Sequence, residues 1–278
     1  MEKLEYIVLS VLCLIALGLF LLGCEQISAP NEVLNNPLDT LSSAFSQPVA
    51  IIISGPSESQ TVTVPSVTFT WQGNAGAKEF SYNCDAGGWS VWSAQTSATL
   101  NYLDEGKHTF AVHARHHNGI TIERNPPQID FMVDAVKGPS LMFCPRRTSV
   151  LRWQTFTYDI KAEEVSFMYG TKMSIQYDPT YVTVTGIIAG AMVNSNSGTS
   201  IVLPTIDSVA HTITIEIATI GRTPKGVSGS GVIATLQCKA LVAGTTLFQF
   251  NSTQTLLRDT LNAPITPNTL VQGRVEIQ

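Results

Sequence analysis

Four histidines at positions 108, 113, 116 and 117 are the only group in the sequence that suggests metal binding. Imidazole is the most common metal ligand in proteins. If the strand-like segment HTFAVHARH continues past Arg115, His113 and His117 share one face, because side chains alternate along a strand. No cysteine or carboxylate lies at a ligand spacing from them, however. We therefore expect a solvated strand end here, with no metal and no cofactor.

Residues that could do catalysis are scattered. The segment GVSGSG at 226–231 has glycines and serines, but it does not fit the nucleophile motif G-x-S-x-G and no helix pattern follows it. We expect it to connect strands. The acidic residues lie at turns or strand ends without a convergent partner: Asp104, Glu105, Glu163, Glu164 and Asp178. We therefore expect no catalytic residues and no enzymatic activity.

One cysteine has a clear chemical context near the N-terminus. An uncharged apolar run from Ile7 to Gly23 ends at Cys24. The stretch Leu21-Leu22-Gly23-Cys24 resembles the bacterial lipobox. The resemblance implies a signal peptide at residues 1–23, which forms a helix and is removed, and lipid attachment to Cys24. The n-region, MEKLEY, lacks the usual net positive charge, and a short uncleaved transmembrane anchor remains the alternative.

Lipidation would fix the location of the chain. Each buried CH₂ of an acyl chain contributes about 0.8 kcal/mol, so two or three chains hold a protein firmly on a membrane. Residues 24–48 are rich in Asn, Ser and Pro without a strand or helix period, as expected of a flexible spacer. We expect an extracytoplasmic protein attached to a bacterial membrane, at the outer membrane or cell surface.

Three further cysteines belong to the exported part: Cys84, Cys144 and Cys238. An oxidising compartment permits disulfides, but an odd number leaves at least one free thiol. Cys144 and Cys238 lie in the same half of the chain and their pairing stays open. We favour a role as small buried apolar side chains.

The composition predicts an all-β protein. Charged residues make up 13% of the 278 residues and the net charge is −5, so no basic stripe is available for a nucleic acid. Val, Ile and Thr are abundant beyond the spacer, and runs of Leu, Ala, Glu and Lys are missing.

Residues 49–135 contain six or seven short alternating runs between glycine turns. Phe69 and Trp71 share one face of the run TFTW, and Phe110, Val112 and Ala114 share one face of HTFAVHARH. This pattern predicts a β-sandwich. The stretch from F-S-Y-x-C-D to W-S-x-W-S, followed by L-D-E-G-K-H-T-F-A-V-H-A-R, resembles bacterial fibronectin type III modules. The resemblance implies a fibronectin type III or immunoglobulin-like fold.

The segment GGWSVWS also resembles the W-S-x-W-S box of animal cytokine receptors. In those receptors arginines stack between the tryptophans, and no such arginine ladder is visible here. Trp89 and Trp92 are three residues apart, so on a regular strand they face opposite sides. We interpret the resemblance as coincidental, with one ring in the core and the other packed at the edge of the sandwich or stacked on a glycan.

Residues 138–278 contain nine alternating or apolar runs and no amphipathic helix, which predicts a second sandwich. Several stretches resemble cohesin domains and occur in the family's order: QTFTYDIKAE at 154–163, YGTKMSIQYDP at 169–179, GVSGSGVIATL at 226–236, AGTT at 243–246 and GRVEI at 273–277. The resemblance implies a jelly-roll sandwich whose flat face binds a dockerin, a small calcium-carrying module of a partner protein.

Alternation along the Y-D-P strand predicts which side chains are exposed. Met173, Ile175 and Tyr177 should face the core. The resemblance implies that the outward residues of this strand and of HTITIEIAT contact the partner: Lys172, Ser174, Gln176, Thr212, Thr214 and Glu216. Gly170 and Lys172 stand where well-studied cohesins have polar contact residues, which is a departure from the family pattern.

These observations predict a membrane-anchored scaffold protein that captures a dockerin-bearing partner, in assemblies that act on polysaccharide. Two alternatives remain open at this point. The chain could bind carbohydrate directly, through the exposed tryptophan of the first sandwich or through Tyr158 and Phe248 of the second. It could also be a structural lipoprotein of the envelope.

Overall fold

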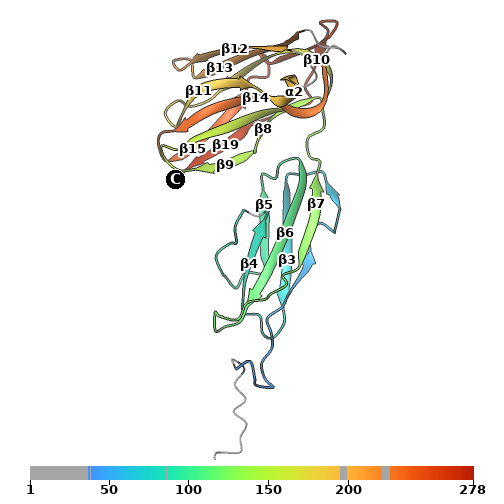
Figure 1. Ribbon diagram of the computed structural model, residues 1–278, viewed down its shortest axis with the longest axis vertical. Helices are drawn as coiled ribbons and strands as arrows, with labels where there is room; N and C mark the ends of the chain where they lie inside the picture. Colours follow the sequence, from blue (N-terminus) through green and yellow to red (C-terminus); the bar gives the residue numbers. More distant parts are fainter. Residues whose placement is uncertain (1–36, 38, 86, 195–198, 221–225) are drawn as a thin grey trace, which may run out of the picture. The chain divides into compact units, whose positions relative to one another are not determined.

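The computed structural model describes residues 37, 39–85, 87–194, 199–220 and 226–278. Almost all regular structure is β, in two sandwiches that each have a hydrophobic core (Figure 1). The expected signal peptide and Cys24 lie outside the described residues. The described part of the expected spacer, residues 37 and 39–48, forms turns and loops. None of the helices among the described residues is long and apolar enough to cross a membrane.

The first sandwich consists of a three-stranded and a four-stranded sheet. The three-stranded sheet has the order β1-β3-β5 and the four-stranded sheet the order β2-β7-β6-β4. Seven strands divided in this way match the strand count of a constant-type immunoglobulin sandwich. The strands are β1 (Ala50–Ser54), β2 (Thr61–Val62), β3 (Ser66–Gly73), β4 (Glu79–Cys84), β5 (Ser97–Asn101), β6 (Gly106–Arg115) and β7 (Gln128–Val133).

Aromatic rings fill the space between these two sheets. Phe69 of β3 stacks on Phe110 of β6 with ring centroids 3.9 Å apart. Trp71 packs against Phe110 and Phe80, and the Phe131 ring packs against Phe69 with centroids 5.7 Å apart. The alternation in TFTW and HTFAVHARH thus predicted the correct inward faces, and Phe69, Phe110, Val112 and Ala114 are fully buried.

The described residues of the second sandwich form twelve strands and one short helix. They are β8 (Ser140–Cys144), β9 (Arg147–Val150), β10 (Thr155–Gln176), β11 (Val182–Ala189), α2 (Ala191–Asn194), β12 (Thr199–Asp207), β13 (Thr212–Ile220), β14 (Val227–Ala240), β15 (Gly244–Phe250), β16 (Leu256–Asp259), β17 (Pro264–Ile265), β18 (Thr269–Val271) and β19 (Gly273–Ile277).

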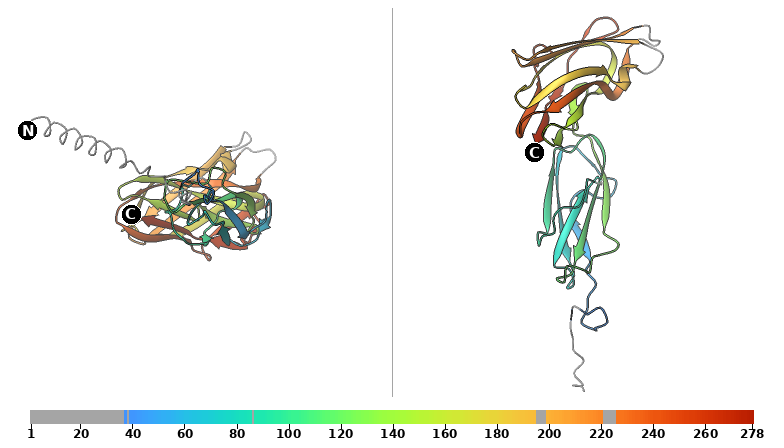
Figure 2. Two further views of the ribbon diagram at one scale, coloured as in Figure 1. Left: turned by 90° about the horizontal axis from the view of Figure 1, so that it is seen from below. Right: turned by 60° about the vertical axis from the view of Figure 1, so that its left-hand side comes forward.

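Strand β10 belongs to both layers of the second sandwich. Its first half pairs with β14 and β8, and its second half pairs with β13 and β16. β11 extends the first layer by pairing with β14, and β12 extends the second layer by pairing with β13. Figure 1 labels these strands, and the right-hand view of Figure 2 shows the sandwich from another side. The alternation predicted for the Y-D-P strand is confirmed, because Met173 and Ile175 are fully buried and Tyr177 nearly so.

The middle of β10 changes layers through a distorted stretch. The register with β14 shifts between Ala162 and Met168, and Glu164 and Phe167 have positive φ angles of 49° and 52°. The GVSGSG segment lies opposite this stretch. The Ser230 hydroxyl accepts a hydrogen bond from Glu164 N (3.1 Å), and the Ser228 hydroxyl accepts one from Phe167 N (2.9 Å). Residues 227–231 of GVSGSG therefore belong to strand β14 and support a bulge, whereas the sequence predicted only a connection between strands.

Strand β12 lies at the edge of its layer. Among the described residues it pairs with β13 alone, over the whole length from Thr199 to Asp207. Pro204 lies in the middle of this strand, opposite Ile215, and its ring is exposed. Proline in a sheet is confined to such edge positions, because it has no N–H to donate.

The aromatic core of the first sandwich yields a test of the fold. Phe110→Ala removes a fully buried ring and leaves a cavity beside Phe69, so it should lower the free energy of unfolding by about 3–5 kcal/mol. Urea denaturation followed by fluorescence measures this change. Val91→Ala, at a side chain that is 87% exposed, should change the free energy by less than about 0.5 kcal/mol. Equal effects of the two substitutions would contradict this core.

Candidate functional site

The outward side of the second layer carries the residues for which the sequence predicted a binding role. Four strands contribute to it in the order β16, β10, β13 and β12. Their register places side chains in rows across the face. One row runs from Leu256 through Lys172 and Glu216 to Leu203, and the next runs from Arg258 through Gly170 and Ala218 to Ile201. We call this surface the β12–β16 face.

An ion pair lies in the centre of this face. The Nζ atom of Lys172 is 3.0 Å from Oε1 of Glu216, and each side chain is 48% exposed. The two residues are direct cross-strand neighbours. An exposed pair of this kind contributes little to stability, because water screens it. Its charges remain accessible to a partner.

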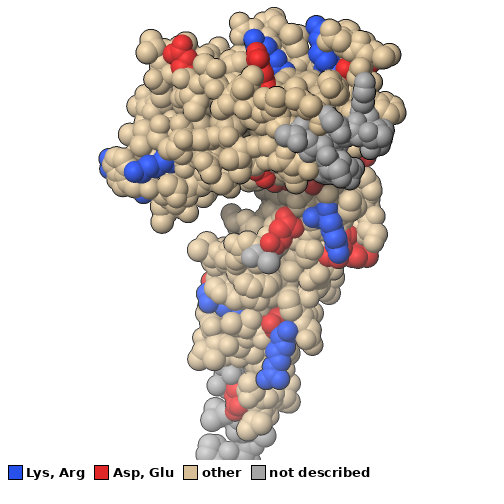
Figure 3. Space-filling model, turned by 45° about the horizontal axis from the view of Figure 1, so that its top comes forward, with Lys and Arg blue, Asp and Glu red and all other residues tan. Residues whose placement is uncertain are grey.

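Apolar side chains surround the ion pair. Ile201, Leu203 and Leu256 are 44%, 59% and 45% exposed, and Leu261, in the turn after β16, is 85% exposed. They border an open hollow of about 670 Å³, which Gly170 and Ala218 also line. Figure 3 shows a side of the molecule on which Lys, Arg, Asp and Glu cover only a small part of the surface. Clusters of exposed apolar residues typically mark interaction sites in soluble proteins.

Five of the six predicted contact residues remain accessible on the outward side. Lys172, Gln176 and Glu216 are exposed, and Thr212 and Thr214 are half-buried.

The prediction of an exposed Ser174 is wrong, because this residue is only 3% exposed. The segment between β15 and β16 passes over it. Ser174 Oγ donates to Gln254 Oε1 (3.0 Å), Ser174 N donates to Thr255 Oγ1 (3.3 Å) and Ser174 O accepts from Asn251 N (2.8 Å).

The first sandwich contains a stacked ladder that the sequence analysis missed. The His113 ring is parallel to both indoles, with centroids 3.8 Å from Trp89 and 4.4 Å from Trp92, so it lies between them. The Arg115 guanidinium lies 4.7 Å from the Trp92 ring and pairs with Glu79. The order is Trp89, His113, Trp92, Arg115. Both tryptophans are on one side, which corrects the expectation that they face opposite sides and that no ladder exists.

The serines of GGWSVWS explain this geometry. Ser90 N donates to Tyr82 O and the Ser90 hydroxyl accepts from Tyr82 N, while Ser93 and Phe80 exchange backbone hydrogen bonds. The segment therefore contacts β4 at every third residue rather than at every second one. A three-residue repeat, as in polyproline II, puts positions i and i+3 on the same side. Sequence reasoning assumed a regular strand.

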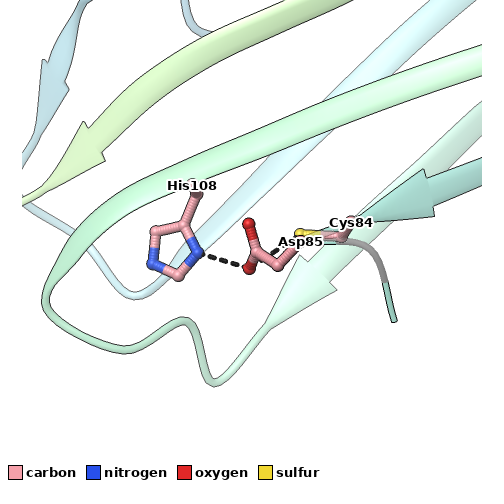
Figure 4. A group of neighbouring side chains, drawn as sticks. All are labelled: Cys84, Asp85 and His108. Carbon is pink, nitrogen blue, oxygen red and sulfur yellow. Dashed lines mark hydrogen bonds and ion pairs between the residues drawn. The ribbon is translucent and has the colours of Figure 1, made fainter. Parts of the chain in front are cut away.

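The histidines do not gather into a metal site. β6 ends at Arg115, so His113 and His117 do not share a strand face as expected. Burial lowers the pKa of His113 below its ordinary value, because the indoles remove water from its ring. His108 instead lies beside Cys84 and Asp85, and the ligand atoms of these three residues lie within 4.8 Å of one another (Figure 4).

This trio is a hydrogen-bond cluster. His108 Nδ1 lies 2.7 Å from Asp85 Oδ2 and its Nε2 lies 2.8 Å from the Asp104 carbonyl, so neither imidazole nitrogen is free for a metal ion. Asp85 also accepts from Thr109 N (2.8 Å) and from the Cys84 thiol (3.4 Å). Burial and the Asp85 carboxylate raise the pKa of Cys84 to about 12, so the thiolate that a metal needs is disfavoured. The cluster ties the end of β4 to β6.

The structure shows whether the cysteines are paired and which aromatic side chains of the second sandwich are exposed. Cys84, Cys144 and Cys238 are all free, and burial raises the pKa of Cys144 and Cys238 to about 11 and 12. Tyr158 and Phe248, the expected outward aromatics of the second sandwich, are fully buried. The exposed aromatic residues there are Trp153 and Phe167, at 55% and 59%.

The comparison with family models identifies the second sandwich. The model of the Cohesin domain matches residues 154–277. Residues 154–277 form a Cohesin domain. A Cohesin domain is a non-catalytic domain for protein–protein interaction, so the expectation that the chain has no enzymatic activity agrees with the finding for this domain. No curated protein matches the sequence.

Solved cohesins resemble this Cohesin domain at low identity. A type II cohesin from the cellulosome of Acetivibrio cellulolyticus is 17% identical, with a TM-score of 0.43, and the match covers 49% of this chain and 94% of that one. The Coh-OlpA–Doc918 complex of Clostridium thermocellum is 17% identical, with a TM-score of 0.43, and the match covers 50% of this chain and 98% of that one. A non-cellulosomal cohesin of the archaeon Archaeoglobus fulgidus is 12% identical, with a TM-score of 0.39, and the match covers 50% of this chain and 91% of that one.

The lowered pKa of His113 predicts a pH effect on stability. The folded state favours the neutral ring, so this contribution is complete above pH 6.5 and is lost as the pH falls through the lower folded-state pKa. His113→Phe keeps a flat ring between the indoles but cannot take up a proton. From pH 7.5 to pH 5, the native protein should lose more unfolding free energy than the variant, as measured by urea denaturation. Parallel losses in the two proteins would contradict this environment of His113.

Proposed function

We propose that this chain is an anchored scaffold protein whose Cohesin domain docks a dockerin-type module of a partner. The observation that carries the proposal is the match of residues 154–277 to the Cohesin domain. Solved cohesins of Clostridium thermocellum and Acetivibrio cellulolyticus are described in complex with dockerins. By this analogy the partner supplies the calcium, and this chain supplies the surface.

The β12–β16 face is our candidate for that surface. It is formed by neighbouring strands, so its backbone is rigid, and its outward side chains are accessible. The exposed leucines and Ile201 provide apolar area, while Lys172 and Glu216 provide one charge of each sign. Interfaces commonly combine apolar area with a limited number of polar contacts. Ser174 is excluded from direct contact because the segment 251–255 covers it.

The departures at Gly170 and Lys172 would shape the choice of partner. A glycine at position 170, with Ala218 beside it, leaves the hollow open next to the ion pair. An apolar side chain of the partner would fit this hollow, and an acidic or basic neighbour could reach Lys172 or Glu216. We therefore propose a partner that presents an apolar helix surface with a charged residue next to it.

The rest of the chain would hold this domain away from a membrane. The lipobox resemblance supports lipidation of Cys24 and an extracytoplasmic location at the outer membrane or cell surface. The first sandwich would serve as a fibronectin type III or immunoglobulin-like spacer. Confining a binding domain to a surface raises the local concentration of whatever it captures. Display of enzymes that act on polysaccharide is the role that we propose for such an anchor.

Titration calorimetry of the full-length chain with recombinant calcium-loaded dockerin modules encoded by the same genome tests the docking proposal. Leu203→Asp puts a charge into the apolar part of the face and should weaken binding at least tenfold. Ile120→Asp, at an apolar residue of the first sandwich that is 83% exposed, should leave affinity unchanged. EDTA should abolish binding. Failure of every such dockerin to bind, or equal loss in the two variants, would overturn the proposal.

Lipidation is tested separately by Cys24→Ser. The native protein should incorporate labelled palmitate in a bacterial host and partition into the detergent phase, because acyl chains hold it there. The variant should incorporate no label and accumulate as the uncleaved precursor. Label-free native protein that stays in the membrane would favour the alternative, an uncleaved transmembrane anchor.

A further inference from the structure

An exposed tryptophan occupies a strained position in the second sandwich. Trp153 lies in the turn between β9 and β10, and its φ angle is +68°. This left-handed region suits glycine and asparagine, and a bulky side chain there costs conformational free energy. The side chain is nevertheless 55% exposed, so burial does not repay that cost in full. Strained residues of this kind concentrate at functional sites.

Hydrogen bonds on all sides hold the turn in place. Trp153 N donates to Ala240 O (3.0 Å), Arg152 N donates to Gln278 O (2.9 Å) and Gln154 N donates to Leu151 O (3.1 Å). The Gln154 side chain in turn accepts from Leu151 N (2.9 Å). The backbone is therefore fixed by two neighbouring segments, and the indole is presented in one orientation. A rigid aromatic ring loses little entropy when it binds a ligand.

Two positive charges lie beside this ring. Arg152 Cζ is 4.7 Å and Lys239 Nζ is 5.9 Å from the centre of the Trp153 ring. Arg152 Nε donates to the Leu241 carbonyl (3.0 Å), which fixes the guanidinium. Seven other Lys and Arg side chains of the described chain form ion pairs with a carboxylate within 3.0 Å, whereas Arg152 and Lys239 form no such ion pair among the described residues. Their charges are available to an anionic ligand.

A polar groove continues from the tryptophan along the outer side of the first layer. Lys239 is the cross-strand neighbour of Thr155, and Gln237 is the neighbour of Thr157. These strands and β11 form an open groove of about 480 Å³, lined by Thr155, Phe156, Thr157, Thr185, Gln237 and Cys238. Thr155, Thr157, Thr185 and Gln237 are exposed. Hydroxyl and amide groups in a row on a rigid sheet match the hydroxyl groups of a sugar chain.

We propose that this site, which we call the Trp153 groove, binds an acidic polysaccharide whose sugar rings carry carboxylates. The indole contacts the apolar side of one sugar ring. Arg152 and Lys239 bind the carboxylates, and the threonines and Gln237 bind the hydroxyl groups. The groove lies on the layer opposite to the β12–β16 face, so the chain can hold a polysaccharide and a protein partner through separate surfaces. This proposal does not depend on dockerin binding.

Affinity electrophoresis of the full-length chain in gels that contain polygalacturonate tests the proposal. The native protein should be retarded, and 0.5 M NaCl should reduce the retardation, because salt screens the two cations. Neutral galactan should retard the protein at least tenfold less. Lys239→Gln should weaken binding about three- to tenfold. Trp89→Ala, at the other exposed tryptophan, should leave it unchanged.

Trp153→Asn separates a binding role from a structural one. Asparagine tolerates the left-handed backbone, so the variant should melt at the same temperature as the native protein or higher, yet bind at least tenfold more weakly. Three results would overturn the proposal: unchanged affinity of this variant, equal retardation by polyglutamate, which has carboxylates but no sugar rings, or no retardation by polygalacturonate. Leu203→Asp, which targets the other face, should retain polygalacturonate binding.

Discussion

The second sandwich depends on a single long strand that must satisfy two layers at once. β10 pairs with β14 and β8 in its first half and with β13, β16 and β15 in its second half, so its register fixes five partner strands. The crossing interrupts the ladder and would leave backbone N–H groups of β10 without partners. The hydroxyl groups of Ser228 and Ser230 accept these hydrogen bonds. Both outward surfaces of the domain are therefore positioned by the same strand.

Much of the fold followed from alternation along the chain. A period of two placed Phe69, Phe110, Met173 and Ile175 in the core, because a half-buried strand needs apolar residues on one side only. The same rule placed Lys172 on the outward side. The order of the cohesin-like stretches in the sequence was by itself enough to indicate the fold of the second sandwich. The local sequence pattern was sufficient to predict which side chains are buried wherever a strand is regular and no other segment covers its outer side.

The predictions from sequence were wrong where a distant segment covers a strand or where the backbone is not a regular strand. Ser174 obeys the alternation, but the segment 251–255, some eighty residues later, covers it, and no local rule reveals such a contact. Trp89 and Trp92 were assigned to opposite sides because a strand was assumed, whereas hydrogen bonds at every third residue put both on His113. The left-handed backbone at Trp153 carries no signal in the sequence, since tryptophan is an unexpected residue there.

The proline in β12 affects how the protein behaves when many copies are crowded together. An edge strand with free N–H and C=O groups invites the edge of another sheet to pair with it, and such pairing can propagate into aggregates. Pro204 removes one donor from the middle of this edge and interrupts the regular spacing that a foreign strand would need. At high local concentration, Pro204 would thereby protect copies of the protein against pairing between their sheet edges, while association through side chains remains open.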